Sequence, residues 1–422
     1  MPSGKGIRLV VKDGFHHALS AIIDGHVTTI LTGIVLYIFG SGPVQGFATT
    51  LVLGLMLSLF SSIFIARLCF EFMLDRNWTI TTGYKFSQNA FTNTHFDFIG
   101  IRKKMYILSI AIIIPGIFSI FIRGLDPGLD FTGGRSYIVR FDQNVSTNDL
   151  RTSLLKSYGE SPEVKQFGPK NQVKITTKYL INDRTEKTDS IVNVKLFEGV
   201  KAFYKTPITY DYFKSSDPKK IIGELSSQRV DPTISYALIW QAVFAVFFSL
   251  IIIFIYIAIR FKNWQYGLGG VISLAHDSLI IITMFTLLHG ILPFGMEVDQ
   301  SFIAALLTII GYSIMDTVII FDRIREYNHL YPKRDLANNI NAAINSTLGR
   351  TINTSGIMLV VLIVIFIFGG EVLRGFMFAL LVGVISGTYS SVFNATPIAY
   401  DLIMWGRRRK ERKELASKGK AK

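Results

Sequence analysis

Residues 39–64 read FGSGPVQGFATTLVLGLMLSLFSSIF, and residues 368–393 repeat the pattern as FGGEVLRGFMFALLVGVISGTYSSVF. The two copies share glycine, serine and phenylalanine positions, and each is close to the ~20 residues that cross a bilayer as a helix. Internal symmetry of this kind is typical of transporter-like folds, whose working site lies between two related membrane halves. Because little sequence precedes the first copy, we predict one whole half together with the end of the other.

The composition indicates an integral membrane protein. Half of the 422 residues are apolar, 33 are Phe and only 18% are charged, which is too little polar surface for a soluble chain of this length. Uncharged runs such as 237–259 and 352–368 recur along the sequence and have the length of a membrane span. We predict about eight transmembrane helices, near residues 26–40, 46–70, 105–122, 234–259, 265–289, 299–321, 353–368 and 373–398.

Positive charge is placed beside the predicted spans. The net charge is +14, and the basic residues cluster at span ends, at Arg102–Lys104, Arg260, Lys262, Lys333, Arg334 and Arg407–Arg409. Short basic loops face the cytoplasm, so we predict cytoplasmic N- and C-termini and a cytoplasmic 322–350 loop, which leaves Arg123 and Arg374 outside. This placement argues against nucleic-acid binding. The basic tail, 401–422, is expected to lie in solvent near anionic lipid headgroups.

Residues 124–232 are predicted to form a small extracytoplasmic α+β domain. The expected strands are 136–141, 164–167, 173–179 and 208–213, and the expected helices are 147–158 and 185–204. This order of elements is that of a ferredoxin-like split βαβ domain. The domain has few His residues and no carboxylate pair at a catalytic spacing, so we do not expect an enzyme. The chain has one cysteine, Cys69, and no Cys/His spacing that predicts a disulfide, a metal site or a haem.

Seven short motifs follow one another along the chain. They are LDFTGG at 129–134, LAHD at 274–277, GYSIMD at 311–316, FDRIRE at 321–326, RT at 350–351, TSG at 354–356 and FGGEVLRGF at 368–376. In this order they resemble SecF, the smaller half of the bacterial Sec secretion accessory SecDF. The first hundred residues resemble the C-terminal end of SecD, through DGHVTT at 24–29 and FGSGP at 39–43. The resemblance covers essentially the whole chain, in the order of a SecD–SecF fusion.

The resemblance implies a division of the chain into six parts. They are the end of a SecD-like half at 1–70, a polar cytoplasmic connector at 71–101, a first SecF-like span at 102–123, the extracytoplasmic domain at 124–232, a five-helix bundle at 233–400 and the tail at 401–422. SecDF belongs to the RND-like proton-driven transporters, so the implied fold is an RND-like helical membrane protein with a ferredoxin-like domain.

The resemblance also implies a function and partners. Proton flow through the membrane part would drive movements that help to draw unfolded secretory polypeptides out of the SecYEG channel after the ATP-driven stage. The implied place is the inner membrane, the coupling ion is the proton, and no other cofactor is expected. The implied partner is a SecD-like subunit that supplies further spans, and YajC and YidC are candidate partners. Two alternatives remain open, a small-molecule or lipid exporter of the RND type and a membrane scaffold without transport.

Asp316 is the sharpest candidate for carrying a proton. A carboxylate inside a span is costly and normally faces a polar path or a partner, and burial and a nearby cation act on it in opposite directions. Arg350, at the start of the next span, is its expected partner. The SecF resemblance assigns both positions to proton transport, and the alternative is a static ion pair that fixes helix packing.

Other charged and polar positions are weaker candidates. His276, Asp277 and Thr351 are candidates for a secondary relay, although adjacent helical residues point ~100° apart; the alternative is a polar packing contact. Asp322 and Arg323 are candidates for a gate, with a charge network at a helix end as the favoured interpretation. The remaining positions have bland interpretations, with Asp24 and His26 as an interfacial cap, and Gly383, Ser386, Gly387 and Ser390 as a close-packing face.

Two positions depart from the SecF pattern. Met315 stands where the family usually has Asn, and this removes a polar neighbour of Asp316. Asp231 lies in a Val-Asp-Pro sequence where the family usually has Val-Gly-Pro, and this places an acid at the hinge between the domain and the membrane. Neither departure removes a charged group that the proton mechanism needs.

Overall fold

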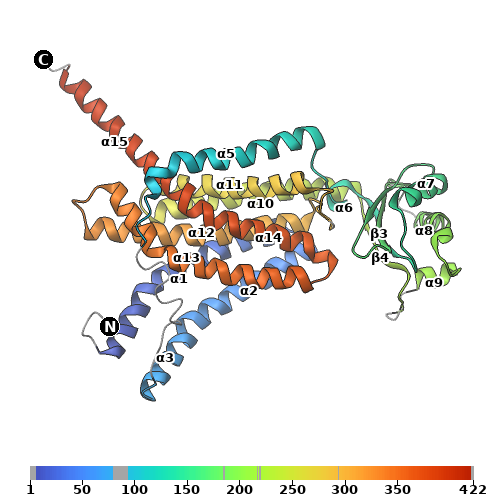
Figure 1. Ribbon diagram of the computed structural model, residues 1–422, viewed down its shortest axis with the longest axis horizontal. Coiled ribbons are helices and arrows are strands. Elements are labelled where there is room, and N and C mark those ends of the chain that lie inside the picture. The colour runs from blue at the N-terminus through green and yellow to red at the C-terminus, as the bar shows by residue number, and fades with distance from the viewer. Residues whose placement is uncertain are drawn as a thin grey trace.

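The computed structural model describes residues 6–78, 94–183, 186–215, 217, 220–292 and 294–419. Eight of its helices are long and apolar enough to cross a membrane, in agreement with the prediction of about eight spans. They form one bundle with a small α+β domain at one end, and the helices α1 and α15 project from the opposite end in different directions (Figure 1). About half of the predicted connector at 71–101, residues 79–93, lies outside the described residues.

Seven of the eight helices extend further than the apolar runs from which they were predicted, and α11 has the predicted length. They are α1 (Ile7–Phe39), α2 (Pro43–Phe60) continued by the π-helical η1 (Ser61–Ile65) and α3 (Ala66–Asp75), α5 (Phe98–Arg123), α10 (Pro232–Arg260), α11 (Trp264–Leu288), α12 (Gln300–Leu330), α13 (Leu336–Phe368), and α14 (Glu371–Ser390) continued by the π-helical η3 (Ser391–Ala395) and α15 (Thr396–Gly419).

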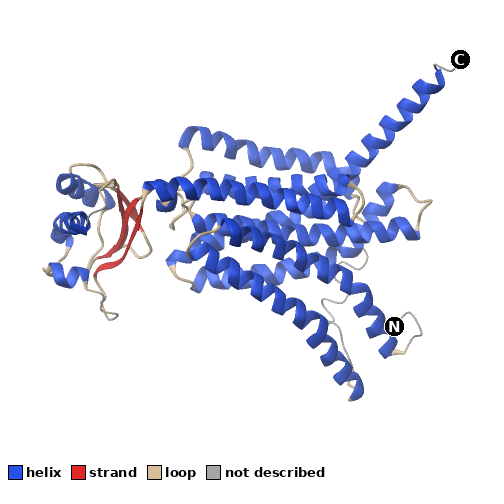
Figure 2. Ribbon diagram, turned by 180° about the vertical axis from the view of Figure 1, so that it is seen from behind, coloured by secondary structure: helices blue, strands red, loops and turns tan. Residues whose placement is uncertain are grey.

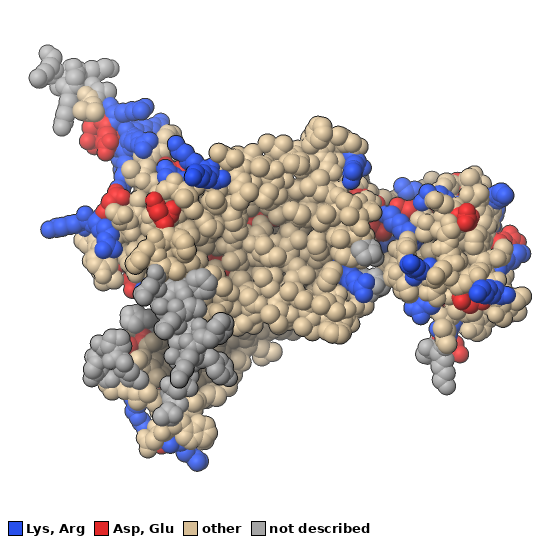
Figure 3. All heavy atoms as spheres, in the orientation of Figure 1, with Lys and Arg blue, Asp and Glu red and all other residues tan. Residues whose placement is uncertain are grey.

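Two of these bounds correct the predictions. The first helix begins at Ile7 and not near residue 26, and the predicted 322–350 loop is mostly helix, so that only residues 331–335 separate α12 from α13. The reason is the same at both places, because the helices continue past the apolar segment with charged and polar side chains. Figure 3 shows an uncharged belt across the visible face of the bundle, with Lys and Arg gathered at the end that carries the C-terminal helix and on the small domain.

Helix α12 is the central element of the bundle. It packs against α1, α10, α11, α13 and α14, and most of its side chains from Phe302 to Phe321 are buried. Close approach depends on glycines. A Cβ at Gly311 of α12 would lie 2.3 Å from Thr32 Oγ1 of α1, and a Cβ at Gly383 of α14 would lie 2.4 Å from Ile309 Cγ1 of α12. The helix that carries Asp316 is therefore in contact with most of the bundle.

The small domain is a four-stranded antiparallel sheet with helices on one face. Its elements are β1 (Gly134–Arg140), α7 (Thr147–Tyr158), β2 (Glu163–Gln166), β3 (Gln172–Thr177), α8 (Glu186–Val200), η2 (Lys201–Phe203), α9 (Tyr210–Lys214) and β4 (Gly223–Val230). The strand order β2-β3-β1-β4 is that of a ferredoxin-like fold. The sheet stands between its own helices and the bundle (Figure 2), so its second face is turned toward the membrane part.

The prediction of the last strand was wrong. Residues 210–214 form the helix α9, which Thr209 caps by accepting a hydrogen bond from the Tyr212 N–H at 3.3 Å. The fourth strand is β4, an edge strand whose side chains are exposed from Leu225 to Arg229. A polar edge strand has no buried face to impose alternation along its length, so hydrophobic periodicity does not reveal it.

Two chain segments join the domain to the bundle. The first contains the one-turn helix α6 (Leu129–Thr132), and it is followed by Gly133 and Gly134 at φ values of 68° and 125°. The second ends at Asp231, whose side chain caps α10 by accepting from the Thr233 N–H at 2.9 Å. The acid at this hinge, where the family usually has glycine, is therefore a helix cap followed by Pro at the first helical position.

Candidate functional site

Asp316 lies inside the bundle, on the central helix α12, with 3% of its surface exposed. The Ser355 hydroxyl of α13 donates to its Oδ2 at 3.5 Å, a long hydrogen bond, and the Thr388 hydroxyl of α14 donates to Ser355 Oγ at 2.7 Å. The carboxylate therefore faces two neighbouring helices through hydroxyl groups and not the lipid, as expected of an acid in a span.

Arg350 lies on α13, one and a half turns before Ser355. Its charge is close enough to interact with that of Asp316. However, both residues belong to the described part of the chain, and their side chains do not form an ion pair within 4.0 Å. The structure therefore places the predicted partners on adjacent helices without locking them together. Thr351 is buried beside Arg350 on the same helix.

Asp277 of α11 is a second acid held by hydrogen bonds inside the bundle. It is fully buried, and three serine hydroxyls donate to it at 2.7 Å, from Ser313 of α12 and from Ser386 and Ser390 of α14. Ser313, which donates to Asp277, lies one helical turn before Asp316 on α12. Asp277 and Asp316 are therefore close to the same part of α12. A buried carboxylate with three donors is well satisfied, which explains how this acid is held within an apolar bundle.

His276 lies next to this cluster. Its Nδ1 is 3.1 Å from Asp277 Oδ1, so the two adjacent residues do meet, although their backbone directions differ. The imidazole ring lies beside the Tyr389 ring at 5.9 Å between centroids, and the Tyr389 hydroxyl donates to the Met105 carbonyl oxygen of α5 at 3.0 Å. The other ring nitrogen, Nε2, is buried and has no hydrogen-bond partner among the described residues.

The serines of this site and Thr388 were missed as functional candidates, whereas Thr351 was among them. Ser386 and Ser390 were interpreted only as members of a close-packing face, together with Gly383 and Gly387. The glycines do pack against α12, where a Cβ at Gly387 would lie 2.8 Å from Ser313 Cβ. The serines instead donate to Asp277. Two hydroxyls four residues apart form one stripe on a helix, and such a stripe in a chain with a second intramembrane acid is the signal that could have indicated them.

Met315 packs away from the acids. A Cβ at Gly25 of α1 would lie 2.7 Å from Met315 Cγ, so the methionine occupies the space that glycine leaves on α1. The departure from the family pattern therefore falls on the α1 face of α12, while Asp316 faces α13 and α14.

The prediction that Asp24 and His26 form an interfacial cap was wrong. Because α1 begins at Ile7, Asp24 lies in the middle of a helix and is buried. Its carboxylate pairs with Arg260 of α10 at 2.7 Å and accepts from the Tyr256 hydroxyl at 2.8 Å. His26 instead contacts the Ile22 carbonyl oxygen through Nδ1 at 2.8 Å. The Asp24–Arg260 pair is a second buried charged contact, between α1 and α10.

Asp322 and Arg323 lie near the end of α12. Asp322 pairs with Arg325, and Arg323 pairs with Glu326 at 2.6 Å, each within one helical turn. Arg323 Nε also donates to Ser346 Oγ of α13 at 3.1 Å. This is the geometry of a charge network at a helix end, which ties α12 to α13. The gating role of these residues stays a prediction.

The chain was compared with protein families and with individual proteins. The family model "Protein export membrane protein SecD/SecF, C-terminal" matches residues 3–76 and 210–405, and the model "SecD/SecF GG Motif" matches residues 118–145. A protein translocase subunit SecF of Rhodothermus marinus is 39% identical over 74% of this chain and 94% of its own length. A protein translocase subunit SecDF of Bacillus subtilis is 31% identical over 94% of this chain and 52% of its own length.

A solved structure agrees with these matches. The crystal structure of SecDF, a translocon-associated membrane protein from Thermus thermophilus, aligns with 96% of this chain at a TM-score of 0.80 and 29% identity, and this chain covers 51% of it. The chain thus spans about half the length of the SecDF relatives that it matches and nearly all of the SecF relative. On these grounds the chain belongs to the SecD/SecF family of protein-export membrane proteins.

Proposed function

We propose that this chain is an accessory subunit of the Sec protein translocase, and that it uses the proton motive force to promote the late stages of protein export. The relatives named translocase subunits SecF and SecDF support the translocase role. The observation that carries the proton step is Asp316, a buried acid on the central helix with a hydroxyl chain to two other helices. An acid in such a position has a cost that a passive scaffold has no reason to bear.

The chemistry of the proposed step is a change of hydrogen-bonding character. The ionised Asp316 carboxylate only accepts hydrogen bonds, as it does from Ser355. A protonated carboxyl carries an O–H donor, so Ser355 must reorient to accept from it, and the Ser355 hydroxyl can then donate to Thr388. Arg350 favours the ionised form when it is near. Because Asp316 lies on α12, each change in this contact acts on the helix that touches most of the bundle.

The proposal extends to partners and to location. The first repeat copy exposes Leu53, Met56, Leu57 and Phe60 and is the least covered of the candidate spans in the described residues. Lipid covers apolar side chains as well as protein does, so it is this difference from the other spans that favours a further membrane subunit here. We therefore infer a SecD-like partner for these spans, a complex with SecYEG in the inner membrane, and cytoplasmic chain ends. YajC and YidC are further candidates, and we propose no enzymatic activity. Co-purification of the tagged chain from native membranes tests these partners directly.

The test of the proton step is translocation of a secretory precursor into vesicles that contain SecYEG, this chain and its SecD-like partner. Asp316→Asn should reduce the proton-dependent part of translocation by tenfold or more, because the amide cannot be ionised. Asp401→Asn is the matched control, because Asp401 pairs with Arg102 of α5 and not with the residues around Asp316. Unchanged translocation by Asp316→Asn would refute the proposed function.

A further inference from the structure

The outer end of α12 is bound to the small domain by a contact that we call the clasp, made of residues 126–130 and 297–300. Its backbone part is a short parallel bridge between Pro127 and Val298. The Val298 N–H donates to the Asp126 carbonyl oxygen at 2.8 Å, and the Gly128 N–H donates to the Val298 carbonyl oxygen at 2.8 Å. The segment that leads into α12 and the segment that leads into the domain are therefore hydrogen-bonded side by side.

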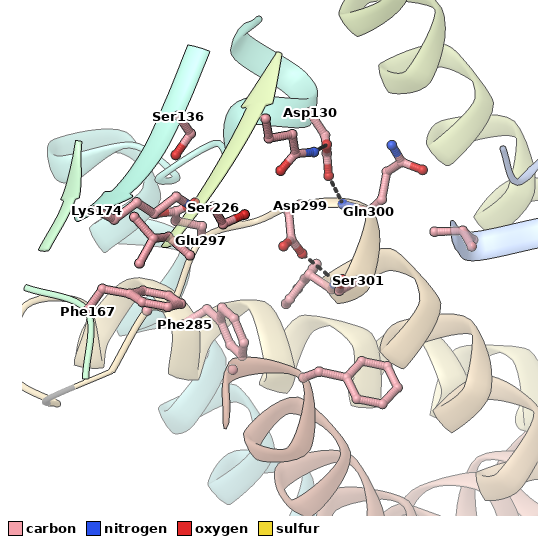
Figure 4. A pocket seen from close by; sticks show the side chains of 17 residues that line it. Asp130, Ser136, Phe167, Lys174, Ser226, Phe285, Glu297, Asp299, Gln300 and Ser301 are labelled. Atoms are coloured by element: carbon pink, nitrogen blue, oxygen red, sulfur yellow. Dashed lines mark hydrogen bonds and ion pairs between the residues drawn. The ribbon is translucent and has the colours of Figure 1, made fainter. Parts of the chain in front are cut away.

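Asp130 extends the clasp into the helix itself. Its Oδ2 accepts from the backbone N–H of Gln300, the first residue of α12, at 3.1 Å, as Figure 4 shows. Its Oδ1 accepts from the Gln228 side chain of β4 at 3.4 Å. The first N–H groups of a helix have no partner within the helix and attract negative charge. One carboxylate thus joins the start of α12 to the sheet.

Two ion pairs complete the clasp. Lys174 of β3 contacts Glu297 at 2.6 Å, and Lys165 of β2 contacts Asp126 at 2.6 Å. The Glu297 and Asp126 side chains are only 13% and 18% exposed, so these pairs are screened less by solvent than pairs on an open surface. Opposite charges on the open face of the sheet and on the clasp therefore attract each other. Reversing the charge of one residue in a pair would turn this attraction into repulsion.

A cavity of about 370 Å³ lies beside the clasp. It separates the open face of the sheet, at Ser136 and Ser226, from the start of α12 and from Phe285 of α11 (Figure 4). Around the clasp the domain is therefore not packed tightly on the bundle. The clasp is the direct contact between the domain and α12 beside this cavity. The cavity leaves space in which the domain can tilt relative to the bundle.

We propose that the clasp is the coupling contact between the proton site and the small domain, with Asp130 and Glu297 as positioning residues that make the domain follow α12. The proposal rests on the proposed function of Asp316. That residue lies sixteen residues beyond Gln300 on one continuous helix, about 24 Å along its axis. A helix moves as a rigid body over this distance, so a displacement at Asp316 reaches the clasp without passing through a flexible loop.

The first test measures the position of the domain in the full-length chain. Spin labels on Glu160→Cys in the domain and Ile122→Cys at the end of α5, in a Cys69→Ser background, report the distance between the domain and the bundle. Asp316→Asn should change this distance distribution when the clasp is intact. Glu297→Lys, which places a positive charge beside Lys174 and Lys165, should abolish that response. A response that persists in Glu297→Lys would overturn the proposal.

The second test separates coupling from folding and from proton transport. In the translocation vesicles, Glu297→Lys should lower proton-dependent translocation about fivefold or more while proton flux continues, and Lys174→Glu combined with Glu297→Lys should restore most of it. Glu198→Lys on the far helix α8 is the matched charge reversal and should have no effect. Failure of the double variant to rescue would overturn the clasp, while loss of flux in Asp316→Asn would still support the proposed function.

Discussion

The two copies of the repeat form the same kind of helix, but the first copy is largely exposed and the second is packed among other helices. The first, α2–η1–α3, and the second, α14–η3–α15, each contain a π-helical turn, Ser61–Ile65 and Ser391–Ala395, which begin within one residue of the same position in the repeat. The first copy presents Leu57, Phe60 and Phe64 on the outside of the structure. The second lies among α11, α12 and α13.

The difference between the copies separates shape from chemistry. Glycines are shared, as at Gly54 and Gly383, and Ser390, which donates to Asp277, corresponds to Ser61, but two other hydroxyls of the site are not shared. Ser386, which donates to Asp277, corresponds to Leu57 in the first copy. Thr388, which donates to Ser355, corresponds to Leu59. The shared positions therefore define the helix and its turn and include one donor, Ser390, while the positions that differ supply the contacts of Ser386 and Thr388.

We expect the largest effect when the second copy receives the residue of the first copy at position 386. Ser386→Leu removes one donor from the buried Asp277 and adds side-chain volume to a packed interface. Loss of a partner by a buried charged group and overpacking cost about 1–3 kcal/mol each or more, so we expect a destabilisation of about 4 kcal/mol and loss of translocation.

Thermal unfolding in detergent measures this effect. The reverse change, Leu57→Ser, lies on the exposed copy and should change the unfolding temperature little. Equal effects of the two substitutions would show that the copies do not differ in the way described.

The next largest effect is expected at Asp299, beside the cavity where the first turns of both copies meet. Val44 of α2 and Phe376 of α14 line this cavity together with Asp299. Burial raises the pKa of Asp299 to about 6, and the charges of Asp130 and Glu297 add to the rise, while Lys174 and the Phe302 N–H oppose it. The folded chain therefore holds this proton more tightly than the unfolded chain, and stability falls as the pH rises from about 4 through 6.

Asp299→Asn removes the buried charge and keeps a residue that caps helices well. A difference of about two pKa units corresponds to about 3 kcal/mol, so the variant should be more stable than the parent chain by at most about 3 kcal/mol at pH 8. The gain should disappear near pH 4. A gain that is independent of pH between 4 and 8 would contradict this assignment.

A third comparison uses the shared glycines. A Cβ at Gly383 would lie 2.4 Å from Ile309 Cγ1, whereas a Cβ at Gly54 would meet no atom within 4 Å. Gly383→Ala should destabilise the chain by about 2 kcal/mol through overpacking. Gly54→Ala should stabilise it by up to about 1 kcal/mol, because alanine favours helix over glycine. Unfolding temperatures of the pair should therefore move in opposite directions.

The smallest effect concerns a contact between equivalent residues. Phe47 and Phe376 occupy the same position in the two copies, and their rings meet edge to face at 5.6 Å between centroids. Such pairs contribute about 0.5–1.5 kcal/mol beyond the area that they bury. A double-mutant cycle with Phe47→Leu and Phe376→Leu should yield a coupling energy of about 1 kcal/mol. Additive effects would mean that the rings are near each other without interacting.

Much of the fold could be predicted from the sequence because the spans are uncharged and long. The ends of α12 and α1 could not, because the helices continue after the apolar pattern stops. The strand β4 could not, because its exposed polar side chains show no alternation. These failures have one cause, since hydrophobic patterns report burial in an apolar environment and not the backbone conformation itself.

The candidate site could be predicted in its acids and not in its hydroxyls. Asp316 and Asp277 are visible because a carboxylate is rare in an apolar run. Ser386 is an ordinary packing residue in a membrane helix until Asp277, 109 positions away in the sequence, is known to face it. Likewise, Arg350 was expected to pair with Asp316 from its place at the start of the next span, but the distance between two side chains depends on helix rotation, which the sequence does not reveal.

The π-helical turn of the second copy has a consequence for the rotational phase of that helix. Small residues recur at every fourth position, at Gly383, Gly387, Ser391, Ala395 and Ala399. On a regular helix each step of four residues overshoots a full turn by about 40°, so this row would rotate by about 160° from end to end. A π-helical turn contains one extra residue, and this residue reduces the rotation of the row by about 100°.

The small residues therefore stay close to one line along the helix, and they pack against two neighbouring helices, one after the other. The first part of the row lies against α12, at Ile309 and Ser313, and its last part lies against Gly269 of α11. The first copy has the same turn and a corresponding row at Gly54, Ser58, Ser62 and Ala66, which begins on the exposed surface. The π-helical turn thus keeps a straight track of small residues along both copies, and in the first copy that track is open at its outer end to another helix.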